Sequence, residues 1–487
     1  MRNSILGLAL SSVLLAGCSL APTYQRPDMP VEASWPQGAA YQAANADGRQ
    51  FAETTWRDYF SDPKLQQVIA LALANNRDLR IAALNIEKAR AQYQISRADL
   101  FPTISAAGSG QGQHTPGTLT PSGREATSHQ YSAGLGFASY EIDLFGRVQS
   151  LKDAALERYF ATEEARRSAQ ISLIAEVANA YLTLAADQDR LKLAQDTLKS
   201  QLASFELTRK RFDLGVASEL DVRQAQTSVE SARVDTARFT GQIARDSNVL
   251  SLLLGTALPT ELQPTTSVES VTALREFPGG LPSEVLLARP DIAQAEHLLR
   301  STNANIGAAR AAFFPSITLT AGAGSASASL GDLFSGDSGA WRFMPSISVP
   351  IFDGSRNTAN LDVAKADEKI AVAQYEKAIQ GAFRETSDAL ADRGTLGAQV
   401  SAQQALVDAS AKSYTLSQSR YDQGVDSYLN VLDSQRSLYG AQQDLIAVRL
   451  ARQANLVTLY KVFGGDGQDK TRRDSAPTGA ASSPSAT

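Results

Sequence analysis

The spacing of apolar positions changes near residue 100, and this change predicts a helix followed by strands. Between Pro63 and Asp99 apolar residues recur every three or four positions, as on one face of a helix. We expect this helix to end at Phe101-Pro102, because proline disfavours a helical conformation in the residue before it. From Ile104 onward apolar residues alternate with small or polar ones, which indicates a β-strand.

Both halves of the chain contain a pair of such alternating stretches, within residues 103–143 and 316–352. The connection from Gln113 to Ser128 is rich in Pro, Gly, Thr and Ser, so the first pair is predicted to be a hairpin with a long polar loop. Tilted strands of about ten residues with one apolar face can cross a bilayer. Four strands cannot close a barrel, and lipid does not tolerate open strand edges, so several chains would have to complete it.

Each expected hairpin is followed by a very long run of helix-forming residues. Residues 148–213 contain no proline or glycine, and these 66 residues (213 − 148 + 1) would form a helix about 100 Å long. Residues 357–422 are a near twin, interrupted only by Gly381, Gly394 and Gly397. Helices this long do not fit a compact domain, so we expect them to lie beside other long helices.

A motif repeated 209 residues apart (420 − 211 = 209) indicates that the chain arose by duplication. Residues 211–218 and 420–427 share Arg, an aromatic residue, Asp, Gly, Val and Ser at matching positions. Gly215 and Gly424 can adopt the left-handed conformation that ends a helix, so each motif is predicted to join two long helices. A duplicated half without an enzyme motif favours an assembled device such as a channel.

Composition excludes several classes of function. The 487 residues are 43% hydrophobic, which is enough for real cores, and the net charge of −5 leaves no large basic surface for nucleic acid. A single cysteine, Cys18, excludes intrachain disulfides and cysteine-based metal sites. The three histidines lack the spacing of a zinc site or a catalytic base, so we expect no enzyme, no metal and no cofactor.

The N-terminus predicts a lipid anchor. A positive start at residues 1–3 precedes an apolar run, and Leu15-Ala16-Gly17-Cys18 ends it with small residues before the thiol, which resembles the lipobox of bacterial lipoproteins. That resemblance implies removal of residues 1–17 and lipid attachment at Cys18. The acyl chains would anchor the protein by burying their methylene groups in the membrane. Ser19 in place of Asp favours the outer membrane. An ordinary secretory signal is the alternative. No later run of 18 apolar residues suggests a transmembrane helix.

Several motifs together resemble the signature of outer-membrane efflux channels of the TolC/OprM type. They are Leu281-Pro282-Ser283, Ala288-Arg289-Pro290-Asp291-Ile292 and the run from Asn305 to Pro315, with the paired turn motifs and the lipobox. The resemblance covers Cys18 to about Gly465. It implies an α+β membrane protein in the outer membrane, a homotrimer whose chains each give four strands to a shared twelve-stranded barrel. That barrel would continue into a long helical barrel in the periplasm.

The resemblance also implies partners and a gate at the periplasmic turns. A periplasmic adaptor and an inner-membrane pump of the RND type would complete the conduit, docking at the turns through Gly215, Val216, Gly424 and Val425. Just past the second turn, one helical face is predicted to carry Leu429, Asp433 and Arg436, which match the family's gate. A solvated face with an internal ion pair is the alternative.

The two halves differ at this position, because Asp433 corresponds to Gln224 in the first half (433 − 209 = 224). We therefore expect the second helix pair to close the tunnel. Arg420 and Tyr421 are candidates for holding it to a neighbouring helix, with Asp221 and Glu206 as possible acidic partners.

The predicted organisation is an internal two-fold repeat. Its segments are a signal peptide (1–17), an extended segment (18–62), a first repeat (63–274, long helices 148–254), a second repeat (275–463, long helices 357–463) and a disordered tail (464–487). The expected function is passive export of drugs, solvents or other toxic small molecules through this channel. A type I protein-secretion channel and a non-pore periplasmic lipoprotein scaffold are the alternatives.

Overall fold

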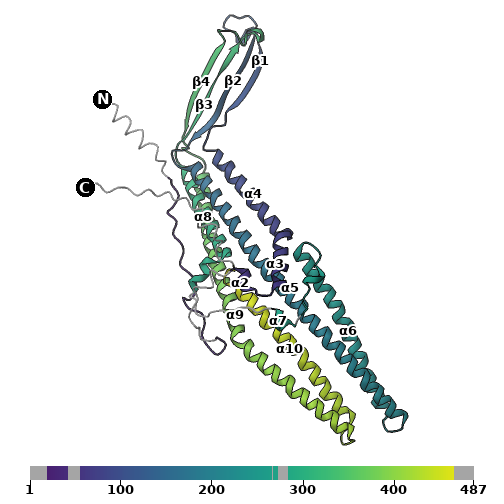
Figure 1. The fold of residues 1–487 in the computed structure, drawn as a ribbon. Helices are drawn as coiled ribbons and strands as arrows, with labels where there is room; N and C mark the ends of the chain where they lie inside the picture. Colours follow the sequence, from purple (N-terminus) through teal and green to yellow (C-terminus); the bar gives the residue numbers. More distant parts are fainter. Residues whose placement is uncertain (1–18, 42–54, 266, 272–282, 466–487) are drawn as a thin grey trace, which may run out of the picture. The chain divides into compact units, whose positions relative to one another are not determined.

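The computed structural model describes residues 19–41, 55–265, 267–271 and 283–465. The predicted signal peptide, the lipid site Cys18 and nearly all of the predicted tail lie outside these residues. The described chain is mostly helical, with one small sheet (Figure 1). The elements in chain order are α2 (Trp56–Tyr59), α3 (Pro63–Asn75), α4 (Arg77–Ala98), β1 (Ser105–Thr115), η2 (Gly117–Leu119), β2 (Ala126–Ile142), α5 (Arg147–Asp213), α6 (Glu219–Leu254), η3 (Thr260–Leu262), α7 (Val268–Val271), η4 (Ser283–Ala288), α8 (Pro290–Ala311), β3 (Ser316–Ser327), η5 (Leu330–Asp332), β4 (Gly339–Ser348), α9 (Arg356–Asp422) and α10 (Tyr428–Val462).

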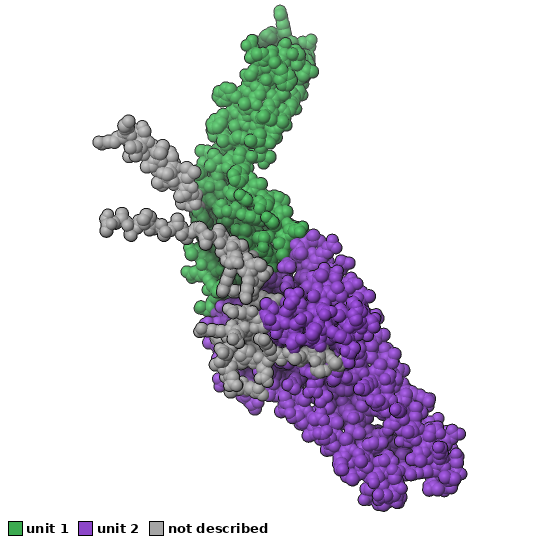
Figure 2. Space-filling model, viewed as in Figure 1, with its two compact units in different colours: residues 1–28, 85–163, 294–375 green, residues 29–84, 164–293, 376–487 purple. Residues whose placement is uncertain are grey.

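The chain divides into two compact units, coloured separately in Figure 2. The first contains all four strands and comprises residues 1–28, 85–163 and 294–375. The second contains both helix turns and comprises residues 29–84, 164–293 and 376–487.

The single helix expected from Pro63 to Asp99 is in fact two helices, α3 and α4, separated at Asn76. The Asn76 side chain accepts a hydrogen bond from the backbone N–H of Leu79 at 2.9 Å, which caps α4. Its amide group donates to the carbonyl oxygen of Leu253 in α6 at 2.9 Å. The apolar repeat did not reveal this break, because it depends on a contact with a distant helix. The second helix ends at Ala98, just before Phe101-Pro102.

The four strands form one antiparallel sheet in the order β1-β2-β3-β4. Ser105 in β1 pairs with Gly136 in β2, and Ser316 in β3 pairs with Ser348 in β4. The loop expected from Gln113 to Ser128 is shorter, because β1 and β2 pair as far as Thr115 and Ala126. The outer edges of β1 and β4 have no partner strand within the described chain.

Glycines let β2 and β3 approach closely. Gly134 is paired with Gly324, and a Cβ atom at Gly324 would lie 2.2 Å from the carbonyl oxygen of Ala133. Cβ atoms at Gly134 and Gly136 would also lie closer than 3.0 Å to backbone atoms of β3, so these three glycines are required by the backbone contact.

The long helices are continuous. Each of α5 and α9 has 67 residues, and the glycines of α9 do not interrupt it. One stretch of α5 is apolar enough to cross a membrane, but 61% of it is buried inside the structure. Burial against other helices therefore accounts for its apolar composition.

The main core of the second unit surrounds the middle of α5. Its buried side chains include Ile174, Tyr181 and Leu182 from α5, with others from α3, α6 and α10. The extended segment before α2 contributes Trp35, whose ring stacks on Phe383 with centroids 5.0 Å apart. The middle of α5 is thus held on several sides, as expected for a long helix that lies beside others.

Candidate functional site

The two turns that join the long helices have the same backbone conformation. Gly215 and Gly424 have φ angles of +75° and +73°, in the left-handed region that favours glycine. The N–H of Val216 donates to the carbonyl oxygen of Arg211 at 2.8 Å, and the N–H of Val425 donates to that of Arg420 at 2.9 Å. Both turns therefore end their helix with the same Schellman-type closure.

The side chains that cap the next helix differ between the turns. At the first turn Ser218 and Asp221 form a capping box, in which the Ser218 hydroxyl oxygen accepts from the Asp221 N–H at 3.2 Å. The Asp221 carboxylate accepts in return from the Ser218 N–H at 3.0 Å. At the second turn Ser427 makes no side-chain cap bond to its helix, and Asn430 stands where the first turn has Asp221.

The second turn has instead an ion pair across it. Arg420 Nε donates to Asp426 Oδ2 at 2.5 Å, and its Nη2 donates to Oδ1 at 3.2 Å. The hydrogen bond from Arg420 lowers the pKa of Asp426, so the pair stays charged at neutral pH. The residue that corresponds to Asp426 in the first turn is Ala217 (426 − 209 = 217), so this pair has no counterpart there.

Arg211 of the first motif reaches the second motif. Its Nη2 donates to Asp422 Oδ1 at 3.2 Å, and its guanidinium lies 4.9 Å from the ring centroid of Tyr421. The Tyr421 ring in turn packs on Tyr428 with centroids 5.2 Å apart. The end of α5 is therefore fastened to the end of α9 by an ion pair and a cation–π contact.

A small apolar cluster beneath the turns holds all four helices together. Tyr428, Val431 and Leu432 of α10 are buried there with Ala225 of α6, and partly buried aromatic residues of α5 and α9 pack around them. Burial raises the pKa of Tyr428 to about 12, so its phenol stays neutral. One side of the start of α10 is therefore buried against the other three helices.

The three predicted gate residues lie on the opposite, exposed side of α10. Leu429 is 56% exposed, and Asp433 and Arg436 are also exposed. Within the described chain neither charged side chain forms a hydrogen bond or ion pair, so the internal pair considered as an alternative is not formed. A row of one apolar, one acidic and one basic side chain therefore faces outward.

The structure gives the four predicted holding residues different surroundings. Tyr421 does contact a neighbouring helix, through Arg211. The acidic partner of Arg420 within the chain is Asp426, while Asp221 caps α6 and Glu206 is exposed. Sequence reasoning missed Asp426, although its position in the second motif and its absence from the first were visible signals.

The predicted docking residues at the turns are exposed, and the first turn is the more apolar. Leu214 and Val216 are 79% and 76% exposed there, and Val425 is 58% exposed at the second turn. Gln423 replaces Leu214 in the second motif. Both turns thus offer apolar side chains to a partner, with more area at the first.

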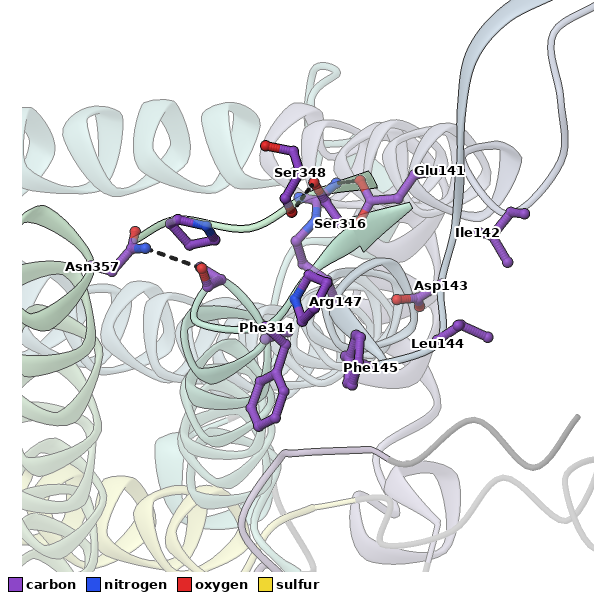
Figure 3. Close-up of a pocket in the computed structure, with 14 residues that line it drawn as sticks. Glu141, Ile142, Asp143, Leu144, Phe145, Arg147, Phe314, Ser316, Ser348 and Asn357 are labelled. Atoms are coloured by element: carbon purple, nitrogen blue, oxygen red, sulfur yellow. Dashed lines mark hydrogen bonds and ion pairs between the residues drawn. The ribbon is translucent and has the colours of Figure 1, made fainter. Parts of the chain in front are cut away.

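The first unit contains a cavity of about 240 Å³ where the strands meet the helices (Figure 3). Arg147 donates to both oxygens of Glu141 at 2.8 and 2.6 Å, and Asn357 donates to the carbonyl oxygen of Ala312 at 3.0 Å. The rings of Phe145 and Phe314 stack with centroids 4.8 Å apart. These contacts join the strand ends to the helix ends.

Comparison with known proteins gives one consistent result. The family model described as outer membrane efflux protein matches residues 68–256 and 281–465. The chain is 51% identical over 471 residues to the toluene efflux pump outer membrane protein TtgC of Pseudomonas putida, covering 97% of each protein. It is equally similar, with the same coverage, to the antibiotic efflux pump outer membrane protein ArpC of Pseudomonas putida.

A solved structure has the same fold. The open state of the Neisseria gonorrhoeae outer membrane channel MtrE matches with a TM-score of 0.83 at 39% identity, over 92% of this chain and 98% of that one. The resemblance noted from the sequence motifs is thereby confirmed.

Proposed function

The chain belongs to the outer membrane efflux protein family, and from this premise we propose that three copies form one channel, gated at its periplasmic helix turns. It is an outer-membrane protein, the channel component of an efflux pump, with its helical part in the periplasm. Proteins of this family are conduits, so the mechanism concerns how a path is opened and closed.

The edges of the sheet support assembly. Within the described residues β1 and β4 leave one edge each unpaired, and unpaired edges are not stable in lipid. Antiparallel pairing of β4 in one copy with β1 in the next satisfies both edges, and three copies give twelve strands. The helical part of each copy then adds two helix pairs, one from each half of the duplicated chain, to a common tunnel.

The exposed face of α10 carries the proposed gate. In a trimer Leu429, Asp433 and Arg436 become three rings near the turns. A narrow ring of leucine can exclude water, and three carboxylates brought close repel one another unless they are paired or bind cations. This exposed and unpaired face, on a helix whose other side is buried, is the observation that carries the proposal.

The contacts around the second turn hold this face in place. Arg211 of α5 contacts Tyr421 and Asp422, so the hairpin of α9 and α10 resists movement away from α5, while the pair of Arg420 and Asp426 stiffens the turn itself. Glu206 is exposed on α5 and remains a candidate partner for a neighbouring copy. Opening then requires these contacts to give way.

Membership of the family supports a proposal for the partners and the cargo. A periplasmic adaptor is proposed to dock on the apolar turns around Gly215, Val216, Gly424 and Val425, and an inner-membrane pump of the RND type to supply energy. The names of TtgC and ArpC refer to toluene and antibiotics, and we propose small toxic molecules of that kind as cargo. Lipid at Cys18 would anchor the chain further.

Conductance in planar bilayers tests the gate. Replacing Asp433 and Arg420 together by alanine is expected to raise single-channel conductance or open time severalfold, because it removes the acidic ring and the tie across the turn. The control is Gln224→Ala, at the position that corresponds to Asp433, with Arg209→Ala, an exposed arginine of the first half, and it should leave conductance unchanged. Equal conductance of the natural protein, the double variant and the control would show that Asp433 and Arg420 do not form the gate.

Oligomeric state, conductance and rescue in cells separate the alternatives. A monomer without conductance would favour the periplasmic scaffold over the channel. In cells that lack their own efflux channel, rescue of growth on toluene or antibiotics would support small-molecule efflux, whereas rescue of protein secretion alone would favour the type I secretion channel.

A further inference from the structure

An arginine stands at the sheet-facing end of each helix that adjoins a strand. Arg97 and Arg310 lie in the last turns of α4 and α8, and Arg147 and Arg356 are the first residues of α5 and α9. In the outer-membrane topology these helix ends lie at the periplasmic side of the strands, where the headgroups of the inner leaflet begin.

Two of the four arginines form side-chain hydrogen bonds within the chain. Arg147 is paired with Glu141 in a bidentate contact, and Arg310 donates to the carbonyl oxygen of Leu20 at 3.1 Å. Arg97 and Arg356 are exposed, and their side chains form no hydrogen bond or ion pair with the residues that the structure describes.

The carboxylates of this region are mostly occupied. Glu141 holds Arg147, while Asp143 accepts from the N–H of Gln149 at 2.8 Å and Asp353 accepts from the N–H of Asn357 at 2.9 Å. Asp99 is exposed and close enough to act on the charge of Arg147. Arg97 and Arg356 therefore keep two positive charges with no partner among the described residues of their own chain.

Exposed apolar side chains stand between these two arginines and the strands. Phe101 and Ile104 separate Arg97 from β1 and are 62% and 70% exposed. Ile351 and Phe352 separate β4 from Arg356 and are 96% and 92% exposed. Aromatic residues and arginines at such a boundary match the apolar and charged layers of a membrane interface.

The sheet topology brings the two groups together between copies. Arg97 precedes β1 and Arg356 follows β4, which are the two outer strands, and both lie at the same end of the sheet. We infer that each seam between copies, where β4 meets the neighbouring β1, forms a site for the headgroup of an anionic phospholipid. Arg97 and Arg356 bind its phosphate, and Phe101, Ile104, Ile351 and Phe352 contact the start of its acyl chains.

This inference rests on the trimer proposed above, and native mass spectrometry tests the two separately. The full-length protein is released from detergent that contains equal amounts of phosphatidylglycerol and phosphatidylethanolamine. It should appear as a trimer that retains up to three phosphatidylglycerol molecules in preference to phosphatidylethanolamine. The variant Arg97→Gln with Arg356→Gln should lose this preference by about fivefold for each arginine removed.

The charge-matched control is Arg80→Gln with Arg209→Gln, two exposed arginines of the second unit, and its lipid preference should equal that of the natural protein. Should the double variant fail to assemble, each single variant serves, with about a fivefold loss expected. A wild-type trimer without lipid preference, or a variant that keeps the preference, overturns the lipid site alone. A wild-type monomer overturns the trimer itself.

Discussion

The two helix turns have the same backbone conformation but differ in the contacts that their side chains make. The first turn is closed on itself, by the capping box of Ser218 and Asp221. The second has no such cap bond; the ion pair of Arg420 with Asp426 crosses it, and Asp422 and Tyr421 connect it to Arg211 of α5. The two turns have the same backbone conformation, because the glycine and the helix closure require it. Their side chains differ: those of the first turn bond within the turn, and those of the second also contact α5.

The largest expected difference between the turns is at Tyr428. This buried side chain corresponds to exposed Glu219 in the first half (428 − 209 = 219). Tyr428→Ala should destabilise the start of α10 by about 3 kcal/mol, because it removes a buried aromatic ring. Hydrogen exchange would show faster exchange at residues 428–436. Glu219→Ala is the control, and similar exchange in both variants would refute the distinction.

The second expected effect concerns Asp246, which corresponds to Asn455 in the second half (455 − 209 = 246). Burial, and then the neighbouring Asp187, raise the pKa of Asp246 to about 6. The folded protein therefore binds a proton between about pH 4 and pH 6 that the unfolded chain releases, and stability falls as pH rises through that window.

Asp246→Asn should raise the free energy of unfolding by about 2 kcal/mol at pH 8, and by less at pH 5, since the amide carries no charge. Thermal unfolding at the two pH values measures this. Asn455→Asp, the reverse change at the matching position, should destabilise the protein most at pH 8. An Asp246→Asn protein whose Tm keeps the natural pH dependence would contradict the assignment.

The third effect is the loss of the contact between the two motifs. Arg211→Ala removes the ion pair with Asp422 and the contact with the Tyr421 ring, together about 1.5 kcal/mol. Channel open time in planar bilayers should increase, because the second turn is then less restrained. Arg211→Lys should retain part of the restraint. An unchanged open time in Arg211→Ala would show that this contact does not restrain the gate.

The smallest effect tests the caps. Ser218→Ala removes a capping-box hydroxyl and should cost about 1 kcal/mol, whereas Ser427→Ala should cost little, since Ser427 makes no cap bond. Hydrogen exchange at the first turns of α6 and α10 compares the two. Equal losses would mean that the turns are capped alike in solution.

Local sequence was sufficient to predict the strands, the two long helices and the two turns. The change of repeat near residue 100 located the strands, the lack of proline located α5 and α9, and the glycines located both turns. Each of these signals depends on the conformational preferences of nearby residues, which the chain carries with it in any context.

Only the tertiary structure decided the contacts made by distant residues. It broke the first helix at Asn76, whose side chain reaches Leu253, and it gave Arg211 its partners in the second motif. It also buried Asp246 beside Asp187 and so changed the pKa of that carboxyl group. Burial and long-range pairing depend on which helices lie together, and no local pattern of residues records that arrangement.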